Sequence, residues 1–173
     1  MTLAGVHIGK RLGQLSTLSR VKHYRGHGVH SPFVYALVRN VFMKRREVVG
    51  EQTALFRELV ARRTVNRRRA VQLQNLYNYC GYTGYSFVGG TGIHPLRDGE
   101  IAVLTVACTA IERMVDEVGE SRGVVCVIAP RDSDERLKAC RRAVERHTGT
   151  SIDNRGYLLL FFNDRLPKQH FKL

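Results

Sequence analysis

The stretch IAVLTVACTAIERMVDEVGESRGVVCVIA, residues 101–129, contains the pattern that decides the fold class. Its two ends, 101–107 and 123–129, are nearly continuous aliphatic runs, which is typical of strands covered on both faces of a sheet. Thr109 stands where a helix N-cap would, and apolar residues then recur at helical spacing: Ile111, Met114, Val115 and Val118. The stretch therefore predicts a strand, a helix running over about 110–118, and a second strand.

Further strand-like runs lie on both sides of this stretch. Residues 85–88 form a short run before a glycine loop, and residues 156–162, GYLLLFF, form another near the end of the chain. Another helix is expected from Asp132 or Ser133 to His147, because its apolar residues fall on one side. Since strands and helices alternate from residue 85 onward, the sequence predicts an α/β fold with a mostly parallel sheet of about four strands.

The chain before this alternation is helical in pattern. In residues 23–42, HYRGHGVHSPFVYALVRNVF, Ser31 is placed as an N-cap and Pro32 as the first helical residue, followed by an apolar helical face. Amphipathic helices are also expected over 51–63 and 67–79.

These patterns divide the chain into two parts. We predict a basic N-terminal helical section over residues 1–80 and an α/β section over residues 81–173, packed together as one compact domain.

The positive charge is concentrated in the first part. Residues 1–75 contain 15 Lys and Arg but 3 Asp and Glu, whereas residues 76–173 contain 13 and 12. Such a field favours nucleic acid or another anionic partner. Its densest cluster is Arg62, Arg63, Arg67, Arg68 and Arg69. Tyrosines that can stack on bases follow it: Tyr77, Tyr79, Tyr82 and Tyr85. The alternative, which we favour, is a solvated helix face above core tyrosines.

Composition bounds the remaining possibilities. The four cysteines are widely separated with no C-x-x-C pair, so we expect reduced, buried thiols. No apolar run approaches 18 residues, and no secretory signal is expected at the N-terminus. These features predict a cytoplasmic protein without a membrane span.

Two small constellations are candidates for chemistry. Gly89, Gly90 and Gly92 follow a strand and can cradle a phosphate or nucleoside, but the interpretation that we favour is a plain glycine turn. His27 and His30 lie just before Ser31, and His23 precedes them. No acid or cysteine completes a metal site in that segment, so we expect the histidines to pack around the helix start.

The two ends of the chain resemble a known family. The letters GHGVHSPF, residues 26–33, and the closing residues 151–153, 156–162 and 167–171 are similar to class I S-adenosylmethionine-dependent methyltransferases common in Bacteroidota. The resemblance implies a reduced Rossmann-like, mostly parallel sheet. It also implies a cofactor loop at Gly89, Gly90 and Gly92, and it leaves a site-lining role open for His27, His30 and Ser31.

The middle of the chain departs from that family. Where the resemblance implies acidic residues around the cofactor, this sequence has Phe87, Ala107 and the pair Ala129-Pro130. Asp98 and Glu100 lie between the strands as partial substitutes. The resemblance further implies about two strands and a helix that are missing before Gly123.

These departures predict a non-catalytic methyltransferase-like protein with no cofactor. The alternatives are an active S-adenosylmethionine-dependent methyltransferase and a basic nucleic-acid-binding protein. A shortened sheet that leaves apolar surface uncovered would also favour a homodimer.

Overall fold

The computed structural model describes residues 31–118 and 121–173. A six-stranded sheet lies at its centre, with strand order β1-β2-β3-β5-β4-β6. The strands are β1 (Gly84–Val88), β2 (Glu100–Leu104), β3 (Val124–Ile128), β4 (Thr150–Asp153), β5 (Tyr157–Phe161) and β6 (Gln169–Lys172). Because only β5 runs antiparallel to its neighbours, the sheet is mixed and mostly parallel, as the sequence predicts.

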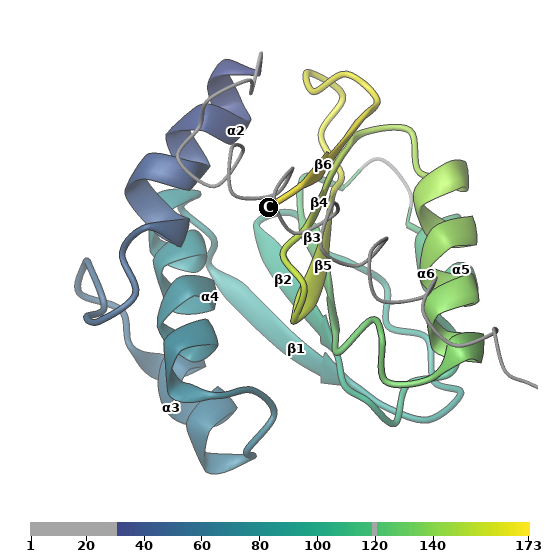
Figure 1. Cartoon of the computed structure of the whole chain (residues 1–173), viewed down its shortest axis with the longest axis horizontal. Coiled ribbons are helices and arrows are strands. Elements are labelled where there is room, and N and C mark those ends of the chain that lie inside the picture. Colours follow the sequence, from purple (N-terminus) through teal and green to yellow (C-terminus); the bar gives the residue numbers. More distant parts are fainter. Residues whose placement is uncertain (1–30, 119–120) are drawn as a thin grey trace, which may run out of the picture.

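Helices cover both faces of this sheet and give three layers (Figure 1). One layer holds α2 (Pro32–Leu37), the π-helical turn η1 (Val38–Phe42), α3 (Ala54–Ala61) and α4 (Arg67–Tyr79), and the other holds α5 (Ile111–Asp116) and α6 (Asp134–Arg146). Each sheet face packs on its own group of buried apolar residues. The exposed sheet surface that favoured a homodimer is therefore covered by helices, and the dimer stays a prediction.

The helical layer shares its core with the sheet. Phe33 packs edge-on against Phe161, with ring centroids 5.1 Å apart, and Phe42 lies 6.5 Å from the ring of Tyr157. A buried polar chain adds to this contact: the Tyr157 hydroxyl donates to Gln72 Oε1 at 3.2 Å, and Gln72 Nε2 donates to the Phe42 carbonyl at 2.7 Å. The helical layer and the sheet therefore form one packed unit.

Several local predictions are confirmed. Ser31 Oγ accepts from the Val34 N–H at 3.4 Å, Pro32 begins α2, and α4 spans the expected residues 67–79. Ser133 caps α6 through the N–H of Arg136. Helices α3 and α5 are shorter than the sequence predicts.

Two predictions are wrong. Thr109 does not cap α5: its hydroxyl donates to the carbonyl of Gly90 at 3.3 Å, and Ala110 takes the cap position. The sheet has six strands rather than about four, because β4 and β6 add to it. Each of these strands is only four residues long and carries polar residues, so neither presents the apolar run from which the other strands are predicted.

The connections from β1 to β4 move in one direction across the sheet, whereas the hairpin from β4 to β5 turns back. The chain passes from β2 through α5 to β3, and from β3 through α6 towards β4, so right-handed crossovers place α5 and α6 on the same face. Doubly wound sheets bind their ligands where the strand order reverses. The described strands β1, β2 and β3 stand in chain order and provide no such reversal among them.

Candidate functional site

The carboxyl ends of β1, β2 and β3 meet at one edge of the sheet, where open α/β sheets bind their ligands. The glycine loop follows β1 at this edge, residues 105–108 follow β2, and Ala129-Pro130 follow β3. The predicted cofactor loop therefore lies at the edge where a ligand would bind.

The glycine loop is tied to the chain that follows β2. Gly90, at φ +62°, donates its N–H to the Ala107 carbonyl at 3.0 Å and accepts from the Thr109 N–H at 2.9 Å. Residues 91–98, all of them described, contain no helix. Phosphate loops present free N–H groups at a helix N-terminus. Gly89, Gly90 and Gly92 thus form an exposed turn whose middle amide is already used.

A buried arginine closes the neighbouring part of this edge. Arg136 lies in the first turn of α6 and is only 7% exposed. Its guanidinium donates six hydrogen bonds to five backbone carbonyls, at 2.7–3.3 Å: those of Thr105, Val106, Cys108, Ile128 and Ala129. These carbonyls belong to the ends of β2 and β3 and to the turns after them. The guanidinium therefore occupies the place where a ligand would meet the two strand ends.

Sequence reasoning did not single out Arg136. The residue stands three positions after the N-cap Ser133, where a capping box would have Glu or Gln. A cation in the first turn also opposes the helix macrodipole. A basic residue at this position was thus the one available signal that its side chain has a partner elsewhere.

The substitutes proposed for the missing acids lie at the wrong edge. Glu100 begins β2, so it stands at the amino ends of the parallel strands, opposite the glycine loop. It accepts from His94 Nε2 at 2.8 Å and from the Arg97 N–H at 2.9 Å. Burial raises the pKa of Glu100, but these hydrogen bonds outweigh burial, so the pKa is lowered. Asp98 accepts a hydrogen bond from the Arg122 N–H. Both carboxylates are structural.

Phe87 and Ala107 occupy the positions where the family resemblance implies cofactor-binding acids. The ring of Phe87 packs against Tyr85, with centroids 6.0 Å apart, and the guanidinium of Arg62 lies 4.6 Å above it. Ala107 is exposed beside the glycine loop. Neither residue can accept a hydrogen bond through its side chain.

Three of the five clustered arginines make side-chain contacts within the described residues. Arg62 also pairs with Glu58 at 2.7 Å, and Arg67 lies over a phenylalanine ring, that of Phe56, at 5.2 Å. Arg69 packs against Gly156, where an added Cβ would lie 2.0 Å from its guanidinium carbon. The other two, Arg63 and Arg68, are exposed and make no ion pair with the described residues.

The tyrosines that follow the arginines mostly contact one another. Tyr77 is buried, and its ring lies 6.4 Å from that of Tyr82 and 6.2 Å from that of Tyr85, both edge-on. Of the four predicted tyrosines, only Tyr79 is exposed, at 47%. The core role that we favoured for the tyrosines therefore describes three of them.

The histidine segment is only partly covered by the structure. His27 and His30 lie outside the described residues. Ser31 is buried, and its hydroxyl caps α2. Over residues 31–118 and 121–173, no group of three or more His, Cys, Asp or Glu side chains could hold a metal ion.

Two further findings concern composition. The four cysteines are free thiols, of which Cys108, Cys126 and Cys140 are buried and Cys80 is half-buried. Burial raises the pKa of Cys140 to about 11. None of the helices within the described ranges combines the length and the apolar content needed to cross a bilayer.

Comparison with known proteins does not add a family to these observations. The chain matches no protein-family model, no curated protein and no solved structure.

Proposed function

We propose that this protein is a methyltransferase-like α/β protein that neither binds S-adenosylmethionine nor transfers methyl groups. The observation that carries the proposal is the position of Arg136. Its buried guanidinium donates six hydrogen bonds to backbone carbonyls at the ends of β2 and β3 and in the turns after them. A ligand that meets the ends of β2 and β3 would have to displace that side chain and leave its carbonyls unpaired.

Charge supports the same conclusion. S-adenosylmethionine carries a positive sulfonium, and a buried guanidinium at the edge repels it more strongly than an exposed one would. Its ribose hydroxyls also need an acceptor, and each buried group left unpaired costs about 1–3 kcal/mol. The residues that stand at the implied acceptor positions are Phe87 and Ala107.

A thermal-shift titration tests the proposal. S-adenosylmethionine and S-adenosylhomocysteine are added separately to the full chain, because a ligand that binds only the native state raises Tm. We expect no shift with either compound. S-adenosylhomocysteine lacks the sulfonium charge. Comparing the two compounds therefore distinguishes repulsion of the sulfonium by Arg136 from the lack of acceptors for the ribose hydroxyls. A dose-dependent rise with S-adenosylmethionine, corresponding to a micromolar Kd, would refute the proposal and restore an active methyltransferase as the leading function. A rise with S-adenosylhomocysteine alone would overturn the closed edge and leave charge repulsion as the barrier to S-adenosylmethionine.

The basic helical layer supports a second candidate function, binding of nucleic acid. Among the described residues of this layer, Arg62–Glu58 is the one ion pair, whereas the opposite layer pairs Arg142 and Arg146 with carboxylates. The exposed Arg63 and Arg68 thus contribute uncompensated charge. Phosphate binding by such residues weakens steeply with salt.

Fluorescence anisotropy with labelled RNA and DNA at several salt concentrations tests this candidate. Arg63→Glu with Arg68→Glu should abolish binding. A control with the same charge change, Lys138→Glu with Arg165→Glu, should retain it. Equal loss in both variants would indicate a nonspecific effect of net charge and would reject this surface.

A further inference from the structure

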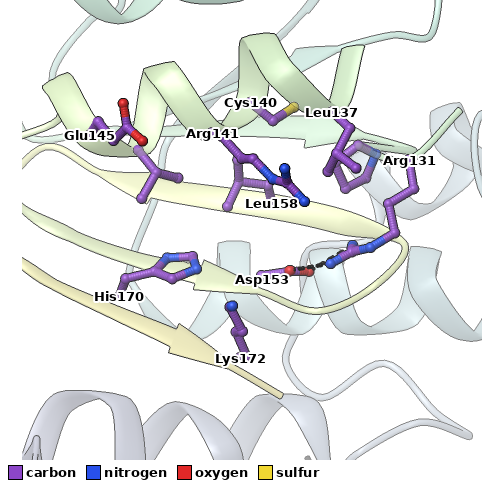
Figure 2. Close-up of a pocket in the computed structure, with 11 residues that line it drawn as sticks. Arg131, Leu137, Cys140, Arg141, Glu145, Asp153, Leu158, His170 and Lys172 are labelled. Atoms are coloured by element: carbon purple, nitrogen blue, oxygen red, sulfur yellow. Dashed lines mark hydrogen bonds and ion pairs between the residues drawn. The ribbon is translucent and has the colours of Figure 1, made fainter. Parts of the chain in front are cut away.

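A cavity with none of the glycine-loop residues in its wall lies between α6 and the β5-β4-β6 end of the sheet (Figure 2). Its volume is about 330 Å³, within the range of small-molecule sites. The cavity has charged side chains on one part of its wall and apolar side chains on another.

The register of the strands builds the floor of this cavity. Asp153 of β4 stands opposite Leu158 of β5 and Lys172 of β6, so the three side chains form a row on the face beneath α6. Ser151 and His170 form the next row on the same face. A polar strip thus crosses the end of the sheet, and α6 covers it only partly.

One carboxylate in the cavity is already neutralised. Arg131 holds Asp153 with two guanidinium hydrogen bonds, drawn as dashed lines in Figure 2. The N–H of Arg155 also donates to Asp153 Oδ1 at 3.0 Å. Bidentate pairing of this kind fixes both partners in place. Asp153 therefore orders one end of the cavity without leaving a full negative charge there.

Two cations on the cavity wall, Arg141 of α6 and Lys172 of β6, differ from Arg142 and Arg146 of α6, which pair with carboxylates. Arg142 donates to Glu112 at 2.8 and 2.9 Å, and Arg146 donates to Asp116 at 2.6 Å. In contrast, Arg141 and Lys172 line the cavity and make no ion pair with the described residues. Glu145 lies on the rim, towards the end away from Arg131 (Figure 2).

The remaining wall supplies a hydrogen-bonding ring and an apolar surface. His170 Nδ1 lies 2.8 Å from Ser151 Oγ, which leaves Nε2 as the ring nitrogen for a ligand. Leu137, Val144 and Leu158 form the apolar side. Such a wall suits the organic part of a molecule rather than a free ion.

We propose that this cavity binds a small organic phosphate monoester. Its phosphate group, which is close to a dianion at neutral pH, lies between Arg141, Lys172 and His170 Nε2. Its organic group lies against Leu137, Val144 and Leu158. A dianion matches two unpaired cations better than a single carboxylate does, and the cavity exceeds what inorganic phosphate alone fills. The site is a binding site that shares no lining residue with the glycine loop, although its Pro130 directly follows Ala129, whose carbonyl Arg136 binds.

Isothermal titration of the full chain tests this site with four probes: phenyl phosphate, inorganic phosphate, benzoate and phenol. We expect phenyl phosphate to bind at least about tenfold more tightly than each of the other three. Equal binding of inorganic phosphate would overturn the organic part of the proposal. Tighter binding of benzoate would overturn the assignment to phosphate, and no binding of phenyl phosphate at millimolar concentration would overturn the site.

Three variants locate the binding. Arg141→Gln with Lys172→Gln should weaken phenyl phosphate at least about tenfold, because both cations are lost. The control Lys138→Gln with Arg165→Gln removes the same charge outside the cavity and should change binding less than about twofold. Val144→Phe keeps every charge but fills the apolar side, so it should also weaken phenyl phosphate. Unchanged binding in Val144→Phe, or equal loss in the control, would place the ligand elsewhere.

Discussion

Arg136 Nη1 donates a hydrogen bond to the carbonyl of Cys108 at 2.7 Å, joining the start of α6 to the chain after β2. The same guanidinium reaches the Ile128 carbonyl at the end of β3 through Nη2, at 2.8 Å. One side chain therefore holds the ends of two strands and the helix that follows them. The contact that closes this edge to ligands also stabilises the fold.

Replacing this arginine should destabilise the protein. Arg136→Leu leaves five carbonyls without their donor, so we expect the free energy of unfolding to fall by about 3 kcal/mol. Urea denaturation followed by circular dichroism measures the change. Arg142→Leu, an exposed arginine of the same helix, is the matched control and should lose much less. Equal losses in the two variants would show that the carbonyl contacts of Arg136 add no stability.

The buried polar chain should couple the helical layer to the sheet. The Tyr157 hydroxyl accepts from Asn154 Nδ2 at 2.7 Å and donates to Gln72 Oε1 at 3.2 Å. Tyr157→Phe removes both bonds and should cost about 1–2 kcal/mol. Gln72→Met removes the same Tyr157–Gln72 hydrogen bond from its other end. The double variant should therefore lose less stability than the sum of the two single variants. Additive costs in urea denaturation would mean that the hydroxyl and the amide act independently.

The sequence predicts the parts of this fold that are strongly periodic. Helix α4 has its predicted bounds because 13 residues with regular apolar spacing give a clear signal. Strands β3 and β5 are continuous apolar runs, and β2 is one after its first residue, Glu100. Strand β4 reads TSID, and although all four residues are buried, three of them are polar. Their burial depends on neighbouring strands, which no local pattern reports.

The two sites depend on long-range placement, and this is why the sequence did not reveal them. Arg136 belongs by pattern to the polar face of an amphipathic helix, and only the positions of β2 and β3 turn that face towards backbone carbonyls. Likewise, Asp153, Leu158 and Lys172 become neighbours through strand register. The glycine loop was visible in the sequence, but its hydrogen bonds to Ala107 and Thr109 were not.

Stability should fall as the solution becomes mildly acidic. Burial lowers the pKa of His147, whose ring is buried and packs 4.6 Å from that of Phe162. The unfolded chain therefore binds a proton more readily than the folded chain. Stability is lost as the pH falls through about 6.5, the pKa of histidine in the unfolded chain. Burial lowers the pKa of His170 as well, in the same direction.

Urea denaturation at pH 7.5 and pH 5.5 measures this dependence. His147→Gln should show a smaller loss of stability between the two pH values than the unmodified chain. An unchanged pH dependence in His147→Gln would contradict the predicted role of the buried ring.

The most direct test of the closed edge is a crystal of the full chain soaked with S-adenosylhomocysteine. We predict no ligand density beside Gly89 and a guanidinium of Arg136 still bonded to the carbonyls after β2 and β3. A nucleoside seated at the glycine loop, with the arginine displaced, would contradict the account.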